Sequence, residues 1–243
     1  MGWGFDISKG EPQVTEAQVR ARLNTFVGEE VQQVEIEKVS YWYVNQTWAT
    51  QYSVGRVFCG GDAVHRHPPS SGLGSNTCMQ DAFNLGWKLA YVLKGWAKPA
   101  LLDSYSDERA PVGKQIVARA NQSRFDYKHL KAVFGFDQGV QTQAEMLQRI
   151  FAETPEAAEI REKLYQALAI KHYEFNAQGV ELNQRYLSNA VLAEIDEEIF
   201  VQDPQLYLQA TTRPGAKLPH TWLIDAQGDK HSTLAIVGKG RFT

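Results

Sequence analysis

The feature that most constrains this chain is the stretch GRVFCGGDAVHRHPPSSGLGSNTCMQDAFNLGWKL, residues 55–89. A short apolar run ends in Gly-Gly-Asp, a loop rich in glycine, proline and serine follows, and a helical pattern then begins. This order of strand, loop and helix predicts that Asp62 lies at the carboxyl end of the strand, where helix-covered sheets commonly bind ligands. The segment therefore predicts an α/β unit with a ligand site at its junction.

The helix after this loop is predicted to start at Thr77 and to end at Lys94. Thr77 with Gln80 three residues later forms a capping-box signature, and Gly95 suits the position after a last turn. Small side chains recur every four residues along the same helix, at Ala82, Gly86 and Ala90. They predict a smooth face that a backbone or a flat ligand can approach closely.

Three kinds of ligand are weighed for the loop. Phosphate binding is disfavoured because GLGSNT lacks the third glycine of GxGxxG and the lysine of a P-loop. A metal site would use His65, His67 and Cys78, but an HxH pair points to opposite faces when extended, and no acidic group supports it. A flat cofactor would be held by Asp62, with its electron-rich ring edge at the positive end of the helix.

Other segments give conventional secondary-structure signals. MGWGFDI alternates like a strand, and residues 15–28 predict an amphipathic helix with Thr15 as N-cap and Gly28 at its end. Residues 34–52, rich in β-branched and aromatic side chains, predict one long strand or a bent pair.

The second half of the chain is predicted to be mainly helical. Pro99 suits the first turn of a helix, and Pro111 predicts a break before a further helix to about Leu130. Two more helices are predicted over residues 142–152 and 155–178. The segment HTWLIDAQGDKHSTLAIVG then predicts a strand, a turn at residues 227–229 and another strand.

Composition restricts the class of protein and its partners. The hydrophobic fraction of 43% and the charged fraction of 22% are typical of a globular chain with a sizeable core. A net charge of −3 and the lack of a ~20-residue apolar span argue against nucleic acid or membrane partners. Two cysteines, Cys59 and Cys78, indicate a reducing compartment, and we expect the cytoplasm. Both ends look cut, so we expect a fragment of a longer protein.

The motif residues decide among the ligands, because residues 55–95 resemble the second FAD-binding motif of single-component flavoprotein aromatic hydroxylases. The matching positions are Gly61, Asp62, Ala63, His65, Pro68, Pro69, Gly72, Gly74, Asn76, Asp81, Ala82, Asn84, Leu85, Trp87, Lys88 and Leu89. The similarity continues through LLDSYSDERAPVG and RPGAKLPHTWL, and it is strongest to the phenol and 2,4-dichlorophenol hydroxylase branch.

The resemblance implies an α/β (mixed α+β) fold class, the C-terminal part of a GR2-type FAD-binding and substrate domain. Residues 1–54 would end the substrate-binding sheet region, and residues 55–190 would hold the FAD motif and a long helical region. Residues 191–215 would be a linker, and residues 216–243 would be the truncated start of a thioredoxin-like domain.

The resemblance also implies residue roles. Asp62 would bind the ribityl chain of FAD, Pro69 would line the reactive face of the flavin, and one stretch of backbone would contact the pyrimidine edge. That stretch comprises Gly72, Leu73, Gly74, Ser75 and Asn76. The reaction would be hydroxylation of phenol or a chlorophenol at the ortho position with NAD(P)H and O₂. No catalytic residue is assigned, no metal is expected, and the sequence leaves oligomeric state open, a homo-oligomer included.

The sequence departs from the family pattern at two motifs, and two alternative functions stay open. The chain contains neither GxGxxG nor a recognisable DG motif, so we expect it to bind FAD weakly or not at all by itself. The alternatives are another aromatic substrate, such as a phenylpropionate or a polyketide, and a non-catalytic fragment.

For several residues we favour an ordinary structural role over a functional one. The thiol of Cys78 is expected to be packed rather than activated, and Arg109 is expected to pair with Glu108 at a helix end. For the aromatic residues Trp42, Trp48 and Tyr52, a place in the core is favoured over a place beside the substrate. The histidines His65 and His67 are expected to make ordinary polar contacts.

Overall fold

The computed structural model describes residues 10, 12–140, 142–192, 194 and 196–237. It divides into two compact units, Met1–Tyr43 and Val44–Thr243. In the first unit, helix α1 (Glu16–Val27) forms as predicted. Thr15 and Gln18 make a reciprocal capping box, and Gly28 ends the helix at φ 92°. The strand predicted for MGWGFDI lies outside the described residues.

The long strand predicted over residues 34–52 is wrong. Residues 34–46 have no regular secondary structure, and only Thr47–Trp48 form a strand, β1. The reason is that β-propensity measures how well a side chain fits a pleated, half-buried surface. Tyr41 and Trp42 are instead 53% and 67% exposed, so no such surface receives them.

Short antiparallel pairs make up the strand content of the described residues. Strand β1 pairs with β4 (His65–Arg66), and β2 (Ser53–Val54) pairs with β3 (Val57–Phe58). The hairpin predicted near the carboxyl end is confirmed in its pairing, because β5 (Trp222–Ile224) pairs with β6 (Lys230–Ser232). The predicted second strand is wrong beyond Ser232, whose side chain caps helix α9 (Thr233–Ile236). The described chain is thus mixed α/β and mostly helical.

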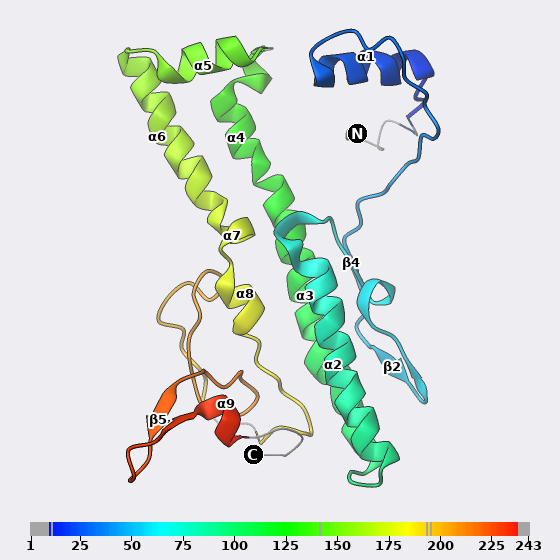
Figure 1. The fold of residues 1–243 in the computed structure, drawn as a ribbon, viewed down its shortest axis with the longest axis vertical. Helices are drawn as coiled ribbons and strands as arrows, with labels where there is room; N and C mark the ends of the chain where they lie inside the picture. Colours follow the sequence, from blue (N-terminus) through cyan, green and yellow to red (C-terminus); the bar gives the residue numbers. More distant parts are fainter. Residues whose placement is uncertain (1–9, 11, 141, 193, 195, 238–243) are drawn as a thin grey trace. The chain divides into compact units, whose positions relative to one another are not determined.

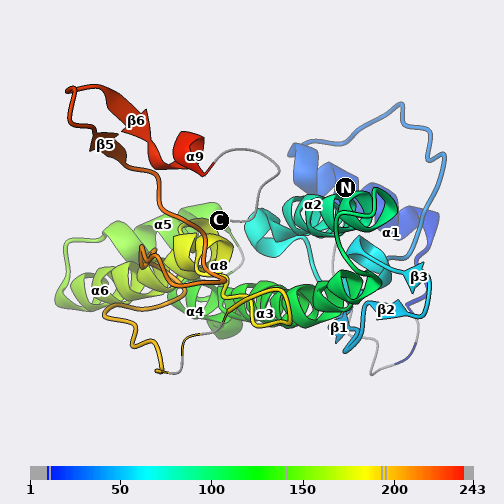
Figure 2. The same cartoon turned by 90° about the horizontal axis from the view of Figure 1, so that it is seen from below.

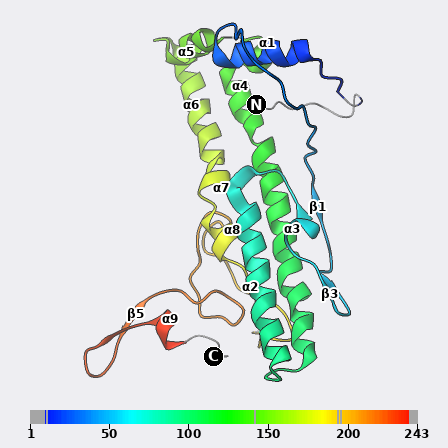
Figure 3. The same ribbon diagram turned by 45° about the vertical axis from the view of Figure 1, so that its right-hand side comes forward.

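Two long antiparallel helices carry the candidate site, as Figures 1 and 3 show. They are α2 (Leu73–Leu93) and α3 (Ser104–Phe125), joined through the 3-10 turn η4 (Pro99–Asp103). The break predicted at Pro111 is wrong, because α3 continues to Phe125. Pro111 and Asp107 are exposed, so water can solvate the backbone carbonyl that the proline leaves without a donor.

A second helical pair extends from the first. Helices α4 (Tyr127–Phe134) and α6 (Pro155–Ile170) are connected by α5 (Gln143–Phe151), which Figure 1 shows across their ends. The predicted helix over residues 142–152 is confirmed. The helix predicted over residues 155–178 ends at Ile170 and is followed by two short helices, α7 (His172–Phe175) and α8 (Gln178–Leu182).

The core lies between α3 and the elements packed on it, as the view from below in Figure 2 helps to follow. One cluster joins α2 and α3 to residues near α8, and it contains Leu73, Val112, Ile116, Ala177 and Val180. The other joins α3 to the turn region and contains Tyr52, Val64, Tyr105 and Ala110. In the part of the chain that the structure describes, no helix is both long and apolar enough to span a bilayer.

Candidate functional site

The amino end of α2 begins four residues earlier than the predicted Thr77. The chain turns sharply at Ser71 (φ 67°) and Gly72 (φ 62°), both left-handed, and enters the helix at Leu73. The capping box predicted for Thr77 and Gln80 is therefore wrong. Thr77 is only 3% exposed and lies in the helix interior, because the left-handed turn has already started the helix.

This helix start is open to a ligand. No side chain caps it, and the first N–H groups of a helix have no partners within the helix. A Cβ atom added at Gly72 would meet no heavy atom within 4 Å, so the approach to the backbone is clear. Gly72, Ser75 and Asn76 are exposed, whereas the side chain of Leu73 is buried in the core. The aligned backbone dipoles make this end positive.

The Gly-Gly-Asp turn packs tightly against its neighbours. Gly61 has a φ of 61°, and a Cβ atom there would lie 2.9 Å from the Cys78 Sγ atom on α2. A Cβ atom at Gly60 would lie 2.9 Å from the Tyr105 hydroxyl on α3. Both positions require glycine because the backbone approaches so closely. The turn is thereby held against the two long helices.

Asp62 lies in this turn, within the 3-10 segment η2 (Gly61–Ala63) that follows β3. Its backbone carbonyl accepts a hydrogen bond from Arg66 Nε at 3.0 Å. Its side chain is exposed, and among the described residues its carboxylate makes no hydrogen bond or ion pair. Pro69 is also exposed, at the 3-10 turn η3 (Ser70–Gly72). The carboxylate is free to accept hydrogen bonds from hydroxyl groups of a ligand.

Behind the turn, Asp81 forms a buried hydrogen-bond centre on α2. Its Oδ2 atom accepts from the Gly61 N–H at 3.0 Å and from His65 Nε2 at 2.9 Å. Its Oδ1 atom accepts from Arg109 Nε at 2.7 Å. Burial by itself raises the pKa of a carboxyl group, but the bonds from His65, Gly61 and Arg109 outweigh it and lower the pKa of Asp81. The carboxylate stays charged.

About two helical turns farther along α2, a second buried ion pair joins the same two helices. Lys88 Nζ donates to Glu108 Oε2 at 2.6 Å, and Asn84 and Ser188 donate to the same carboxylate. Burial lowers the pKa of Lys88, and Glu108 offsets part of that effect. The predicted pair between Arg109 and Glu108 is wrong. Adjacent residues point to different neighbours on a helix, so each finds its own partner on α2.

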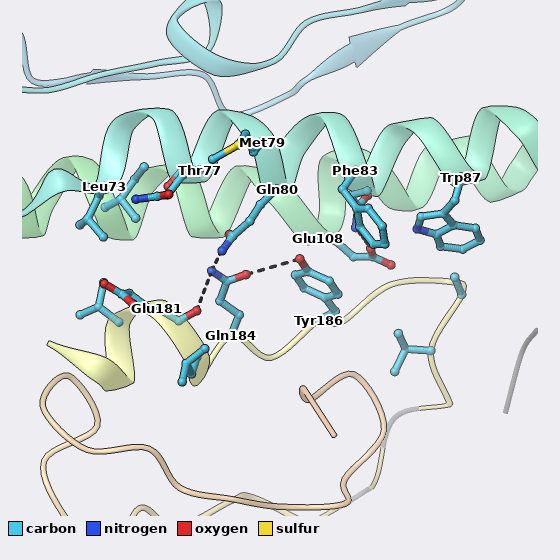
Figure 4. A pocket seen from close by; sticks show the side chains of 17 residues that line it. Leu73, Thr77, Met79, Gln80, Phe83, Trp87, Glu108, Glu181, Gln184 and Tyr186 are labelled. Atoms are coloured by element: carbon cyan, nitrogen blue, oxygen red, sulfur yellow. Dashed lines mark hydrogen bonds between the residues drawn. The ribbon is translucent and has the colours of Figure 1, made fainter. Parts of the chain in front are cut away.

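A pocket of about 790 Å³ lies beside the first turns of α2. Figure 4 shows Phe83 and Trp87 on α2 facing the segment that carries Gln184 and Tyr186. The Gln184 side chain donates to Gln80 Oε1 at 2.9 Å across this pocket. The pocket shares Leu73 and Asn76 with the open helix start, so an aromatic-walled space adjoins the candidate cofactor position. Sequence reasoning missed this pocket because residues 180–191 gave no signal of proximity to α2.

The remaining predicted residues have the following environments. The core position favoured for the aromatic residues is confirmed for Tyr52, which is 1% exposed, and is wrong for Trp42 and Trp48, which are 67% and 36% exposed. His65 is buried against Asp81, and His67 Nδ1 contacts the Pro68 carbonyl at 2.7 Å. Trp48 lines a second hollow of about 1650 Å³.

The metal alternative and the cysteine were also tested by the geometry. Within the described residues, no group of three or more His, Cys, Asp or Glu side chains could hold a metal ion. Burial, and then the charge of Asp62, raises the pKa of the Cys78 thiol. The packed, unactivated thiol preferred from the sequence is therefore confirmed.

Comparisons with known proteins point to one class of enzyme. A family described as FAD binding domain matches residues 1–120. The chain is 46% identical over 246 residues to the 2,4-dichlorophenol 6-monooxygenase of Cupriavidus pinatubonensis, covering 99% of this chain and 41% of that protein. It is 46% identical over 245 residues to the phenol 2-monooxygenase of a Pseudomonas species, covering 99% of this chain and 40% of that protein.

The fold matches a solved structure of the same class. The flavin-dependent monooxygenase PieE, in complex with FAD and substrate, superposes with a TM-score of 0.78 at 43% identity. The match covers 98% of this chain and 41% of that one. The chain thus spans about two fifths of the length of the relatives it matches.

Proposed function

Because the chain belongs to the family of FAD-binding aromatic hydroxylases, we propose that it supplies part of the FAD site of a phenol or chlorophenol monooxygenase. The resemblance deduced from the sequence is confirmed by the 46% identity to two such enzymes across the chain. The proposed reaction is hydroxylation at the ring position ortho to the phenolic hydroxyl, in the cytoplasm, with NAD(P)H and O₂. The observation that carries the proposal is an unpaired, exposed Asp62 carboxylate held beside the uncapped start of α2.

The described residues fit the cofactor in charge and in access. The Asp62 carboxylate would accept hydrogen bonds from ribityl hydroxyl groups. The N–H groups at the start of α2, which no side chain caps, would face the pyrimidine edge, where the positive end of the helix stabilises negative charge. Gly72 leaves that approach unobstructed. Pro69, exposed at the turn before the helix, would lie along the reactive face of the ring.

The chemistry divides between the cofactor and the chain. When bound, the flavin would supply electron transfer from NAD(P)H and the activation of O₂. The residues of this chain bind and orient it and restrict water around it. The aromatic wall of Phe83 and Trp87 adjoins the helix start and contributes apolar surface there. The structure identifies no acid or base for the phenol among the described residues.

The proposal also covers the segment that follows the helical region. The β5–β6 hairpin and α9 are proposed to begin a thioredoxin-like domain from residue 216. An antiparallel strand pair followed directly by a helix supports this assignment.

A flavin titration tests the proposal. Riboflavin, FMN and FAD are added to the purified chain, and flavin fluorescence and absorbance near 450 nm are followed. Riboflavin is included because the turn and the helix start face the ring and the ribityl chain rather than the adenine end. Asp62→Asn removes the charge and keeps the shape. Hydrogen bonds to a charged group contribute roughly 1.5–3 kcal/mol, so affinity should fall about 10- to 100-fold.

Asp103→Asn is the matched control. Asp103 is also exposed and its side chain makes no capping hydrogen bond on α3, so affinity should be unchanged. Equal affinities for the two variants would contradict the proposal. So would a chain that is folded by circular dichroism yet binds none of the three flavins.

A further inference from the structure

The position of Asp62 depends on a backbone that is not rigid by itself. Gly61, directly before it, adopts a φ of 61°, and glycine loses more conformational freedom on folding than any other residue. The strand β3 before the turn is only two residues long. Among the described residues, the Asp62 carboxylate makes no hydrogen bond or ion pair of its own. An external tether is therefore needed to fix the direction of the carboxylate.

That tether is the Asp81 carboxylate. It is 1% exposed and accepts from the Gly61 N–H at 3.0 Å, which fixes the Gly60–Gly61 peptide at the residue directly before Asp62. The same Oδ2 atom accepts from His65, on the strand that follows the turn. Asp81 thus holds the turn from both sides. If the charge of Asp81 is removed, the Gly61 N–H loses a buried, charged acceptor.

Arg109 in turn fixes Asp81. Its guanidinium is fully buried and donates Nε to Asp81 at 2.7 Å, while Nη1 donates to Gln184 Oε1 at 3.0 Å and to the Tyr186 hydroxyl at 2.9 Å. Nη2 donates to Gln80 Oε1 at 3.2 Å. A planar fork held in all these directions cannot rotate. It therefore fixes where the Asp81 oxygen atoms lie.

A second ion pair between the same helices serves as a control, because it stabilises the fold without contacting the turn. Lys88 and Glu108 join the same two helices, are equally buried, and are also held by further polar side chains. Their hydrogen bonds reach Asn84 and Ser188 and none of them reaches the turn. Removing a charge from either pair perturbs the helix contact. Only the Asp81 pair should also alter the turn.

We propose that Asp81 and Arg109 are positioning residues for the cofactor: Arg109 orients the Asp81 carboxylate, which fixes the Gly61 peptide and so the direction of Asp62. The claim that a flavin uses the Asp62 carboxylate in this position rests on the proposed function. The tether itself is a property of the chain and is tested without any flavin.

The test is amide hydrogen exchange, followed by mass spectrometry, on peptides covering residues 58–66 of the flavin-free chain. Asp81→Asn removes the charge, and Arg109→Lys keeps a charge but loses the fork. Exchange of the turn should become about tenfold faster or more in both variants, since a hydrogen bond to a charged group is lost or misdirected. In Glu108→Gln the turn should exchange as in the wild type, while α3 is less protected.

A second readout links the tether to the cofactor. Riboflavin affinity should fall about tenfold in Asp81→Asn and less than twofold in Glu108→Gln. Equal exchange of the turn in these two variants, or unchanged exchange in Asp81→Asn, overturns the proposal. Should Asp81→Asn fail to fold, the milder Arg109→Lys decides in the same way. If the wild type binds no flavin, the proposed function fails, and the exchange data still decide whether the tether exists.

Discussion

The contact between α3 and Tyr52 sets up a sharp test of the packing behind the turn. Gly113 lies in the middle of α3, and a Cβ atom built there would be 1.9 Å from the Tyr52 hydroxyl. It would also lie 3.3 Å from His65 Cδ2. Tyr52 is 1% exposed and its hydroxyl has no hydrogen-bond partner among the described residues, so the ring has little room to move. Gly113→Ala should therefore force Tyr52 out of place.

The magnitude follows from two opposing effects. Alanine favours a helix interior over glycine by about 1 kcal/mol. Overpacking a dense core costs about 1–3 kcal/mol, and a 1.9 Å approach to a buried ring belongs at the upper end. The net expectation is a loss of about 2 kcal/mol in the free energy of unfolding.

Gly86→Ala is the matched control on the partner helix. Gly86 lies inside α2, is exposed, and a Cβ atom there would meet no heavy atom within 4 Å. Only the helix-propensity effect remains, so stability should rise by about 1 kcal/mol. Urea unfolding of the chain, followed by circular dichroism, measures both variants. If the two substitutions shift the free energy of unfolding in the same direction, the close approach of α3 to Tyr52 is refuted.

Two further predictions concern ion pairs. Lys88→Met leaves Glu108 buried without its cation and should lower the free energy of unfolding by about 3 kcal/mol. This is the lower end for a broken buried pair, because Asn84 and Ser188 still donate to Glu108. A loss below about 1 kcal/mol in urea unfolding would contradict the prediction. Hydrogen bonds from Arg185 lower the pKa of Glu198 from 4.5 to about 2, so this carboxylate stabilises the fold above pH 4.5 and the contribution disappears as the pH falls toward 2. Glu198→Gln should remove this part of the pH dependence of the urea midpoint, and a variant with the wild-type slope would disprove the assignment.

Local signals were sufficient where one segment determines its own structure. The capped helix α1 and the β5–β6 hairpin follow from caps and turn residues that lie next to the elements they define. The start of α2 could not be predicted in this way. Ser71 is left-handed although a serine rarely adopts that conformation, and only the packing around the turn, including its hydrogen bond to Ser123, supports it.

Long-range pairing explains the other failures. Arg109 is 28 residues from Asp81, and nothing in the sequence between them shows that they meet. Thr77 and Gln80 resemble a helix cap by spacing, yet the structure buries Thr77 and uses Gln80 to contact Gln184 and Arg109. A spacing rule identifies which residues can interact, and tertiary contacts decide which of them do.

The motif that carries the family resemblance contains two physically different sets of residues. Asp81, Asn84 and Lys88 recur at helical spacing on one face of α2, and all three are buried against polar partners from α3. Asp62, Gly72 and Asn76 are exposed instead. Substitutions in the buried set should change stability and, at Asp81, the geometry of the turn. Substitution of Asp62, whose carboxylate makes no hydrogen bond or ion pair among the described residues, should change flavin affinity while the free energy of unfolding stays nearly constant. Burial, rather than membership of the motif, therefore separates the residues that build the site from those that would contact the cofactor.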